Sequence, residues 1–371
     1  MKILLLSCST GEGHNSAAKA IGEAAKRRKI EYVIADPVAF ASEKAKNVVS
    51  SAYNNMIKHT PKMFGAVYKI GDLFERTGVK SPIYFANASY AENLDKYIRS
   101  GGFDAVICTH LFGMESMTAV RHKKNNPVPC YGVLTDYTCI PFFAEPSIDG
   151  YFIPHKDLTA ELAGKGFDKS SLYPTGIPVS SRFTSHIGKE KARTLLGISG
   201  EKKVIMIMSG GVGCEKIKEL CSEFLKIKDE NLLIYFFTGR NEKMAEKLNR
   251  IYKSNTRINI VPFTDKVNMY MDASDVLMTK PGGLSSTEAA VFGIPIVHIM
   301  TIPGCETRNA EFFARHNMSL RADNNADAVR CALKLAENKN MAETMKGYQR
   351  LNTNADSADM ILDRVTENGN F

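Results

Sequence analysis

The sequence of 371 residues has no apolar run that reaches the roughly 18 residues needed to cross a bilayer. Its opening segment, residues 1–6, is apolar but leads directly into a glycine turn, with no small-residue cleavage site after it. This pattern indicates a buried first strand rather than a signal peptide. We therefore expect a cytoplasmic protein.

Several chemical signatures are also absent. The eight cysteines are scattered, with no Cys-x-x-Cys pair and no histidine spacing suited to zinc, so we expect buried free thiols rather than disulfides or a zinc site. The sequence has no Asp-x-Asp pair, no Gly-x-x-x-x-Gly-Lys-Ser/Thr loop and no Gly-x-Ser-x-Gly elbow. We expect no bound metal, no P-loop ATPase mechanism and no serine-hydrolase elbow.

Positive charge exceeds negative charge moderately, with a formal net charge of +8. Much of the excess lies between Lys19 and Lys80, where basic residues alternate with aromatic and other apolar ones. Such a stretch suits an anionic membrane surface, and it equally suits a solvated helix whose aromatics pack inward. No helix-turn-helix, zinc-finger or RNP pattern accompanies it, so we expect no nucleic-acid partner.

Short aliphatic or β-branched runs alternate with helical patterns along the whole chain, which predicts parallel, doubly wound α/β sheets. The first series of expected strands comprises residues 3–8, 32–35, 105–109, 129–135 and 151–153. The second series comprises residues 204–209, 232–238, 258–261, 276–278 and 296–299. We expect two Rossmann-like domains with an interdomain cleft as the active site.

Proline and glycine between Pro174 and Pro178 mark the expected hinge between the two domains. We place the first domain at residues 1–176 and the second at 177–345. Residues 346–371 are expected to form a C-terminal helix that packs back on the first domain.

The clearest local motif follows the expected strand 276–278 and runs from Lys280 to Glu288. Strand, Gly-Gly turn and helix follow one another, so backbone amides and the positive helix end can attract phosphate. Hydroxyl groups at 285–287 add donors, and Glu288 can accept two ribose hydroxyls. The alternative is an ordinary helix start, with Ser285 as cap and Glu288 completing a capping box.

Two further glycine turns follow expected strands. One spans residues 208–213 and precedes a helical pattern, so it is also suited to phosphate. The other spans residues 9–17, and with Asp36 at the end of the next strand it imitates a dinucleotide fingerprint. A hydride-transfer enzyme is therefore a competing hypothesis. His14, at the start of the first helix, is a candidate base or a polar helix cap.

Other polar residues lie where first-half strands end, the usual ligand edge of an open α/β sheet. They are Thr109-His110 and Thr135-Asp136-Tyr137. Each segment is either part of a binding site or an ordinary polar loop.

Taken together, these motifs resemble the glycolipid-forming GT-B glycosyltransferases, a group that includes the processive diacylglycerol glucosyltransferases and plant monogalactosyldiacylglycerol synthases. The resemblance runs nearly end to end. The motifs that carry it are residues 9–17, 135–137, 175–178, 209–213, 238–241, 263–264, 280–288 and 303–306, with Asn309.

This resemblance implies a hexosyltransferase that uses UDP-glucose or UDP-galactose as co-substrate and needs no metal. It implies that the uracil base lies near Arg240 and Phe263, that the ribose lies on Glu288, and that Glu306 and Asn309 face the sugar. It places the diphosphate against Ser209, Gly210, Gly211, Ser285, Ser286 and Thr287, with Gly282, Gly283, Leu284 and Cys305 completing the donor site. The acceptor would be a lipid such as diacylglycerol, met peripherally at the inner face of the cell membrane.

On the acceptor side, the resemblance implies that His14 activates the acceptor hydroxyl or orients it for displacement at the anomeric carbon, with Gly13, His110 and Asp136 on the same side. The chain departs from its relatives at Cys305, where glutamine is usual, and near Ile140, where histidine is usual. These departures leave open a UDP-sugar sensor without catalysis. A UDP-sugar epimerase of the same fold and the nicotinamide-dependent oxidoreductase also stay open.

Overall fold

The computed structural model describes residues 1–8, 12–41, 79–208, 214–299 and 304–368. It contains two compact units. One comprises residues 1–181, 302–305 and 353–371, and the other residues 182–301 and 306–352. Among the described residues no helix combines the length and apolar character that crossing a membrane requires.

The first unit is built on a parallel six-stranded sheet with the order β2-β1-β3-β4-β5-β6. Its strands are β1 Lys2–Leu6, β2 Glu31–Ala35, β3 Ala105–Cys108, β4 Cys130–Val133, β5 Gly150–Phe152 and β6 Leu172–Tyr173. Its helices are α1 Glu12–Arg27, α4 Pro82–Ala88, α5 Ala91–Gly101, α6 Leu111–Lys124, α7 Thr159–Gly164 and α16 Ser357–Asn368. Short 3-10 turns lie at Pro37–Phe40, Lys156–Leu158 and Lys169–Ser171.

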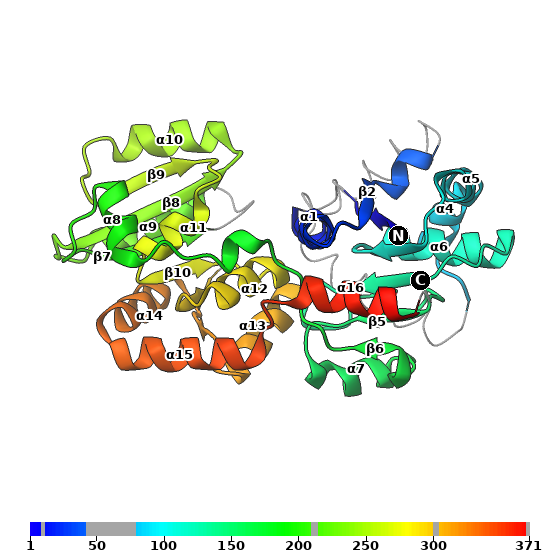
Figure 1. The fold of residues 1–371 in the computed structure, drawn as a ribbon. Coiled ribbons are helices and arrows are strands. Elements are labelled where there is room, and N and C mark those ends of the chain that lie inside the picture. The colour runs from blue at the N-terminus through cyan, green and yellow to red at the C-terminus, as the bar shows by residue number, and fades with distance from the viewer. Residues whose placement is uncertain (9–11, 42–78, 209–213, 300–303, 369–371) are drawn as a thin grey trace. The chain divides into compact units, whose positions relative to one another are not determined.

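Helices cover this sheet on both faces (Figure 1). Ile3 and Leu5 of β1 point to the face that α1 and α16 cover, and the intervening Leu4 and Leu6 are also fully buried. A strand buried on both sides in this way is typical of parallel sheets. Helix α6 packs very close to strand β1 at Gly113, since a Cβ atom on this glycine would lie only 3.1 Å from Leu6 Cβ.

The last helix, α16, belongs to the first unit although it ends the chain. It packs beside α1, and ion pairs join Arg27 to Asp359 at 2.6 Å and Arg28 to Asp363 at 2.5 Å. At the expected hinge, Gly176 has a positive φ of 92°, and its carbonyl accepts a hydrogen bond from Ser357 Oγ at 2.8 Å. The C-terminal segment therefore holds residues 175–176 in place.

The second unit has a parallel sheet with the order β12-β11-β10-β7-β8-β9. Its strands are β7 Lys203–Met208, β8 Leu232–Gly239, β9 Ile258–Pro262, β10 Val276–Thr279, β11 Ile296–His298 and β12 Leu320–Arg321. A 3-10 turn spans Ser181–Phe183. The helices are α8 Lys189–Leu196, α9 Cys214–Leu225, α10 Glu242–Tyr252, α11 Val267–Ala273, α12 Gly283–Phe292, α13 Cys305–Arg315, α14 Asn325–Glu337 and α15 Lys339–Asn352.

Alternation along the strands divides the core of this unit between the two faces of the sheet. Ile205 and Ile207 of β7 pack in the large cluster with α9, α10 and α14, whereas Val204 packs in a smaller one with residues of α8 and α11. Both units therefore confirm the prediction of two doubly wound α/β halves. Among the strands of the described residues, β6 and β12 were not predicted, and each is two residues long.

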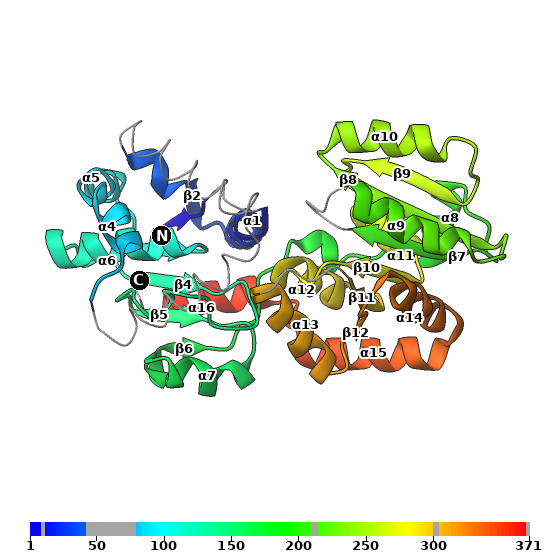
Figure 2. The ribbon, with the colours of Figure 1, turned by 180° about the vertical axis from the view of Figure 1, so that it is seen from behind.

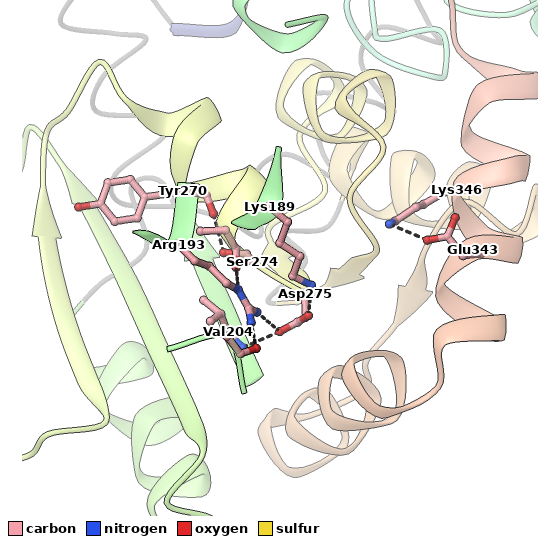
Figure 3. Close-up of polar contacts among 10 residues, drawn as sticks. Lys189, Arg193, Val204, Tyr270, Ser274, Asp275, Glu343 and Lys346 are labelled. Atoms are coloured by element: carbon pink, nitrogen blue, oxygen red, sulfur yellow. Dashed lines mark hydrogen bonds and ion pairs between the residues drawn. The ribbon is translucent and has the colours of Figure 1, made fainter. Parts of the chain in front are cut away.

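Asp275 organises the amino-terminal edge of the second sheet (Figure 3). Its Oδ2 accepts hydrogen bonds from Val204 N at 2.7 Å and from Arg193 Nη2 at 3.0 Å, and Lys189 Nζ pairs with Oδ1. The guanidinium of Arg193 is buried and also donates to Ala273 O at 3.0 Å. A cavity of about 440 Å³ adjoins this network. It lies at the opposite edge of the sheet from the glycine loops.

We predict that Asp275→Asn destabilises the protein by about 3 kcal/mol, because it leaves the buried guanidinium of Arg193 without its anion. The matched control is Glu343→Gln, which breaks the exposed pair with Lys346 also drawn in Figure 3 and should cost less than about 1 kcal/mol. Urea denaturation of the two variants measures both values. Equal costs would show that the Asp275 network does not hold this edge together.

Candidate functional site

The order in which the chain adds strands to the second sheet reverses between β7 and β10. From β7 the chain proceeds to β8 and β9 on one side, and then returns to add β10, β11 and β12 on the other. In open α/β sheets, ligands bind outside the carboxyl ends of the strands at such a switch point. The loops after β7 and β10 are the two glycine turns that the sequence singled out. Ser209, Gly210 and Gly211, in the loop after β7, lie outside the described residues.

Helix α12 begins at this switch point, and the backbone donors of its first turn have no hydrogen-bond partner among the residues that the structure describes. Its N-cap is Gly282, no side chain caps it within the described residues, and the first helical hydrogen bond runs from Ser286 N to Gly282 O at 3.0 Å. The N–H groups of the first turn therefore have no partner inside the helix and carry the positive end of its dipole. The capping-box alternative is wrong, because Ser285 lies inside the helix rather than at its cap.

The three hydroxyls of this helix start differ in what they can offer a ligand. Ser285 is half-buried, whereas Ser286 and Thr287 are fully buried. Thr287 Oγ1 donates to Gly283 O at 2.7 Å, and Ser286 Oγ lies 2.9 Å from His298 Nε2. Leu284 is buried as well. The backbone amides and Ser285 are thus the groups best placed to contact an anion.

His298, at the end of β11, is a buried support for this helix that the sequence analysis missed. Its Nε2 contacts Ser286 and its Nδ1 lies 3.1 Å from Ser319 Oγ. Burial lowers the pKa of His298 to about 3, so the ring is neutral and has one donor and one acceptor nitrogen for the two hydroxyls. The sequence could have suggested His298 because it is a histidine at the end of an apolar strand. Its partners Ser286 and Ser319 lie 12 and 21 residues away, so the sequence pattern did not reveal these contacts.

Glu288 lies on the second turn of α12 and is half-buried. Burial raises the pKa of its carboxyl to about 7, and the positive charge of Arg182 lowers it in part. A carboxylate with weak hydration is a good acceptor for paired hydroxyl groups. The position thus suits the ribose contact predicted for Glu288, and that role stays a prediction.

An exposed aromatic ring follows the end of β9. Phe263 is 60% exposed, and the guanidinium carbon of Arg240, just after β8, lies 5.0 Å from its ring centroid. These two residues come from neighbouring parallel strands, so they lie at the same carboxyl edge as the start of α12. A large exposed ring with a cation on one face can accept a flat heterocycle by stacking.

Helix α13 lies beside α12 (Figure 2). Two of its predicted site residues contact the β10–α12 loop. Glu306 Oε1 lies 2.7 Å from Lys280 Nζ, and the fully buried Asn309 donates from Nδ2 to Pro281 O at 3.1 Å. Cys305 begins the same helix and is half-buried. The structure thus brings Glu306 and Asn309 together with the glycine loop.

In the first unit, His14 lies at the switch point between β1 and β3. Its Nδ1 is 2.7 Å from the carbonyl oxygen of Thr109 and 3.1 Å from Thr135 Oγ1. Because a carbonyl can only accept, Nδ1 carries the proton, and Nε2 holds the lone pair. Burial lowers the pKa of His14, and the Thr109 hydrogen bond raises it in part. The ring is therefore a neutral base at pH 7.

Of the other residues predicted at this edge, His110 contacts His14 directly. His110 is buried, its ring centroid lies 4.6 Å from that of His14, and its Nδ1 accepts from Phe112 N at the start of α6. Burial and the neighbouring His14 hold the pKa of His110 well below its usual value. Gly13 and Asp136 are both half-buried. The segment 42–78, which holds most of the basic and aromatic stretch, lies outside the described residues.

Two family models together match most of the chain. The model for monogalactosyldiacylglycerol (MGDG) synthase matches residues 14–179, and that for the glycosyltransferase family 28 C-terminal domain matches residues 204–360. A curated protein of Bacillus pumilus (strain SAFR-032) is 26% identical over 378 residues, covering 99% of this chain and 94% of that protein. It is named processive diacylglycerol beta-glucosyltransferase.

Solved structures agree on the fold. The chain superposes on Acinetobacter baumannii MurG with a TM-score of 0.63 at 13% identity, covering 99% of each chain. It superposes on S. aureus MnaA with UDP with a TM-score of 0.66 at 13% identity, covering 100% of this chain and 97% of that one. These likenesses confirm the predicted GT-B architecture of two Rossmann-like domains.

Proposed function

Because the chain belongs to the monogalactosyldiacylglycerol synthase family of glycosyltransferases, we propose that it moves a hexose from a UDP-sugar to a membrane lipid such as diacylglycerol. The similar Bacillus protein is named for such a transfer and spans nearly the same length. UDP-glucose and UDP-galactose are the proposed donors. The alternatives of a sensor, an epimerase or a nicotinamide-dependent oxidoreductase have no comparable support.

One observation carries the donor half of this proposal: the uncapped start of α12 at the switch point of the second sheet. Its free amides offset the charge that develops on the diphosphate as the sugar leaves, which is a role that a metal fills in other transferases. The exposed Phe263 and Arg240 supply a stacking surface for the uracil base. Glu288 supplies the acceptor for the ribose hydroxyls.

His14 carries the acceptor half. Its Nδ1 proton is held by Thr109 O, so Nε2 is the nitrogen that can remove a proton from an acceptor hydroxyl. The hydroxyl oxygen then forms a bond to the anomeric carbon while the bond from that carbon to the diphosphate oxygen breaks. UDP leaves with the electron pair, and this single displacement inverts the configuration at the anomeric carbon.

We also propose that the protein works in the cytoplasm, peripherally on the inner face of the cell membrane. The excess of basic over acidic residues between Lys19 and Lys80, interleaved with aromatics, supports attraction to an anionic surface. A diacylglycerol acceptor stays in the bilayer, so the enzyme has to meet it there.

Purified protein should form glycosylated lipid and UDP from UDP-glucose or UDP-galactose on vesicles that contain diacylglycerol. His14→Ala should lower kcat by about 10² to 10⁴-fold, because it removes a general base, while UDP still binds. Product formation is followed by chromatography and UDP binding by calorimetry. The proposal fails if the wild-type protein turns over no UDP-sugar on any lipid tested, and stabilisation by NAD instead of UDP would favour the oxidoreductase.

Donor affinity should depend on pH through Glu288. Since its pKa is about 7 and the ribose needs the carboxylate, UDP-glucose should bind about tenfold more weakly at pH 6 than at pH 8. UDP-glucose is the right ligand because its diphosphate, esterified at both ends, does not titrate in this range. Glu288→Gln should bind more weakly at pH 8 and lose the pH dependence. An unchanged pH dependence in that variant would contradict the assignment of Glu288 to the ribose.

A further inference from the structure

A lysine and a glutamate form an ion pair beside the proposed donor loop. Lys280 follows β10 directly, and its Nζ lies 2.7 Å from Oε1 of Glu306 on the first turn of α13. The Glu306 side chain is only 10% exposed, whereas that of Lys280 is 33% exposed. The carboxylate is therefore largely withdrawn from water, and the ammonium group of Lys280 forms an ion pair with it.

A second contact fixes the same two segments. Asn309 lies three residues after Glu306, hence on the same face of α13, and donates to Pro281 O at 3.1 Å. Asn309 is fully buried. Together the two contacts fasten α13 to residues 280–281, immediately before the Gly282–Gly283 turn. The position of Glu306 is thus tied to the start of α12.

A carboxylate at this place poses an electrostatic problem for the proposed donor. The diphosphate of a UDP-sugar carries two negative charges, and like charges a few ångströms apart in a poorly hydrated site repel one another strongly. An unbalanced Glu306 would repel the diphosphate on α12. Yet a carboxylate is valuable at the sugar end, because its two oxygens can accept hydrogen bonds from two hydroxyls.

We propose that Lys280 is a positioning residue that balances the charge of Glu306 and aims it at two hydroxyls of the transferred hexose. The proposal rests on the function proposed above and deepens it. Lys280 acts through Glu306 rather than on the diphosphate. The pair thereby lets a carboxylate select a polyhydroxylated neutral sugar beside an anionic leaving group.

Calorimetric titration with UDP and with UDP-glucose tests this assignment in wild type, Lys280→Met, Glu306→Gln and the double variant. Lys280→Met should weaken the binding of both ligands about tenfold, since it removes the cation that is paired with the Glu306 carboxylate. The double variant removes both charges, so its affinity for UDP should return to within about threefold of wild type. Its affinity for UDP-glucose should stay about tenfold weaker, because the hydroxyl acceptor is gone.

Lys280→Arg is the matched control, since it keeps the charge, and it should retain most of the UDP-glucose affinity. Melting temperatures establish that each variant is folded. If the double variant binds UDP as weakly as Lys280→Met, then Lys280 contacts the diphosphate itself and the proposal is overturned. Wild-type affinity for both ligands in Lys280→Met also overturns it. A wild-type protein that binds no UDP refutes the proposed function itself, which is a distinguishable result.

Discussion

The backbone amides at the start of α12 are the feature on which the account of donor binding depends. They have no partner within the helix, and Gly282 and Gly283 leave the approach to them open because neither adds a side chain. Their position follows from the order of the second sheet, which reverses beside β10. Side chains around them hold the helix in place: His298 through Ser286 on one side, and Asn309 through Pro281 before the turn.

The first unit uses the same position in its own sheet for a different purpose. Its switch point lies between β1 and β3. The imidazole of His14 lies there, whereas the second unit has the backbone amides of α12 at its switch point. The carbonyl of Thr109 fixes the tautomer of His14, and burial keeps the ring neutral. The same topological rule therefore underlies both halves of our proposal, the anion site proposed in the second unit and the proton acceptor proposed in the first.

The sequence was sufficient for ten of the twelve described strands, because apolar runs such as those of β7 and β10 are buried along most or all of their length. It was insufficient for β6 and β12, which are edge strands too short to show a period. It also singled out the glycine loop and His14 as candidates, since both patterns depend on local order along the chain. The pairing of Lys280 with Glu306, and of His298 with Ser286 and Ser319, depends on contacts between distant segments, which a single sequence does not reveal.

A crystal structure of the protein with bound UDP tests the central claim most directly. The account predicts diphosphate oxygens within hydrogen-bond distance of the amides of residues 283–285, ribose hydroxyls on Glu288 and the uracil ring near Phe263. A diphosphate bound instead at the glycine turn of residues 11–13 in the first unit would contradict it. That position would fit the dinucleotide pattern of the first half and not a UDP-sugar donor.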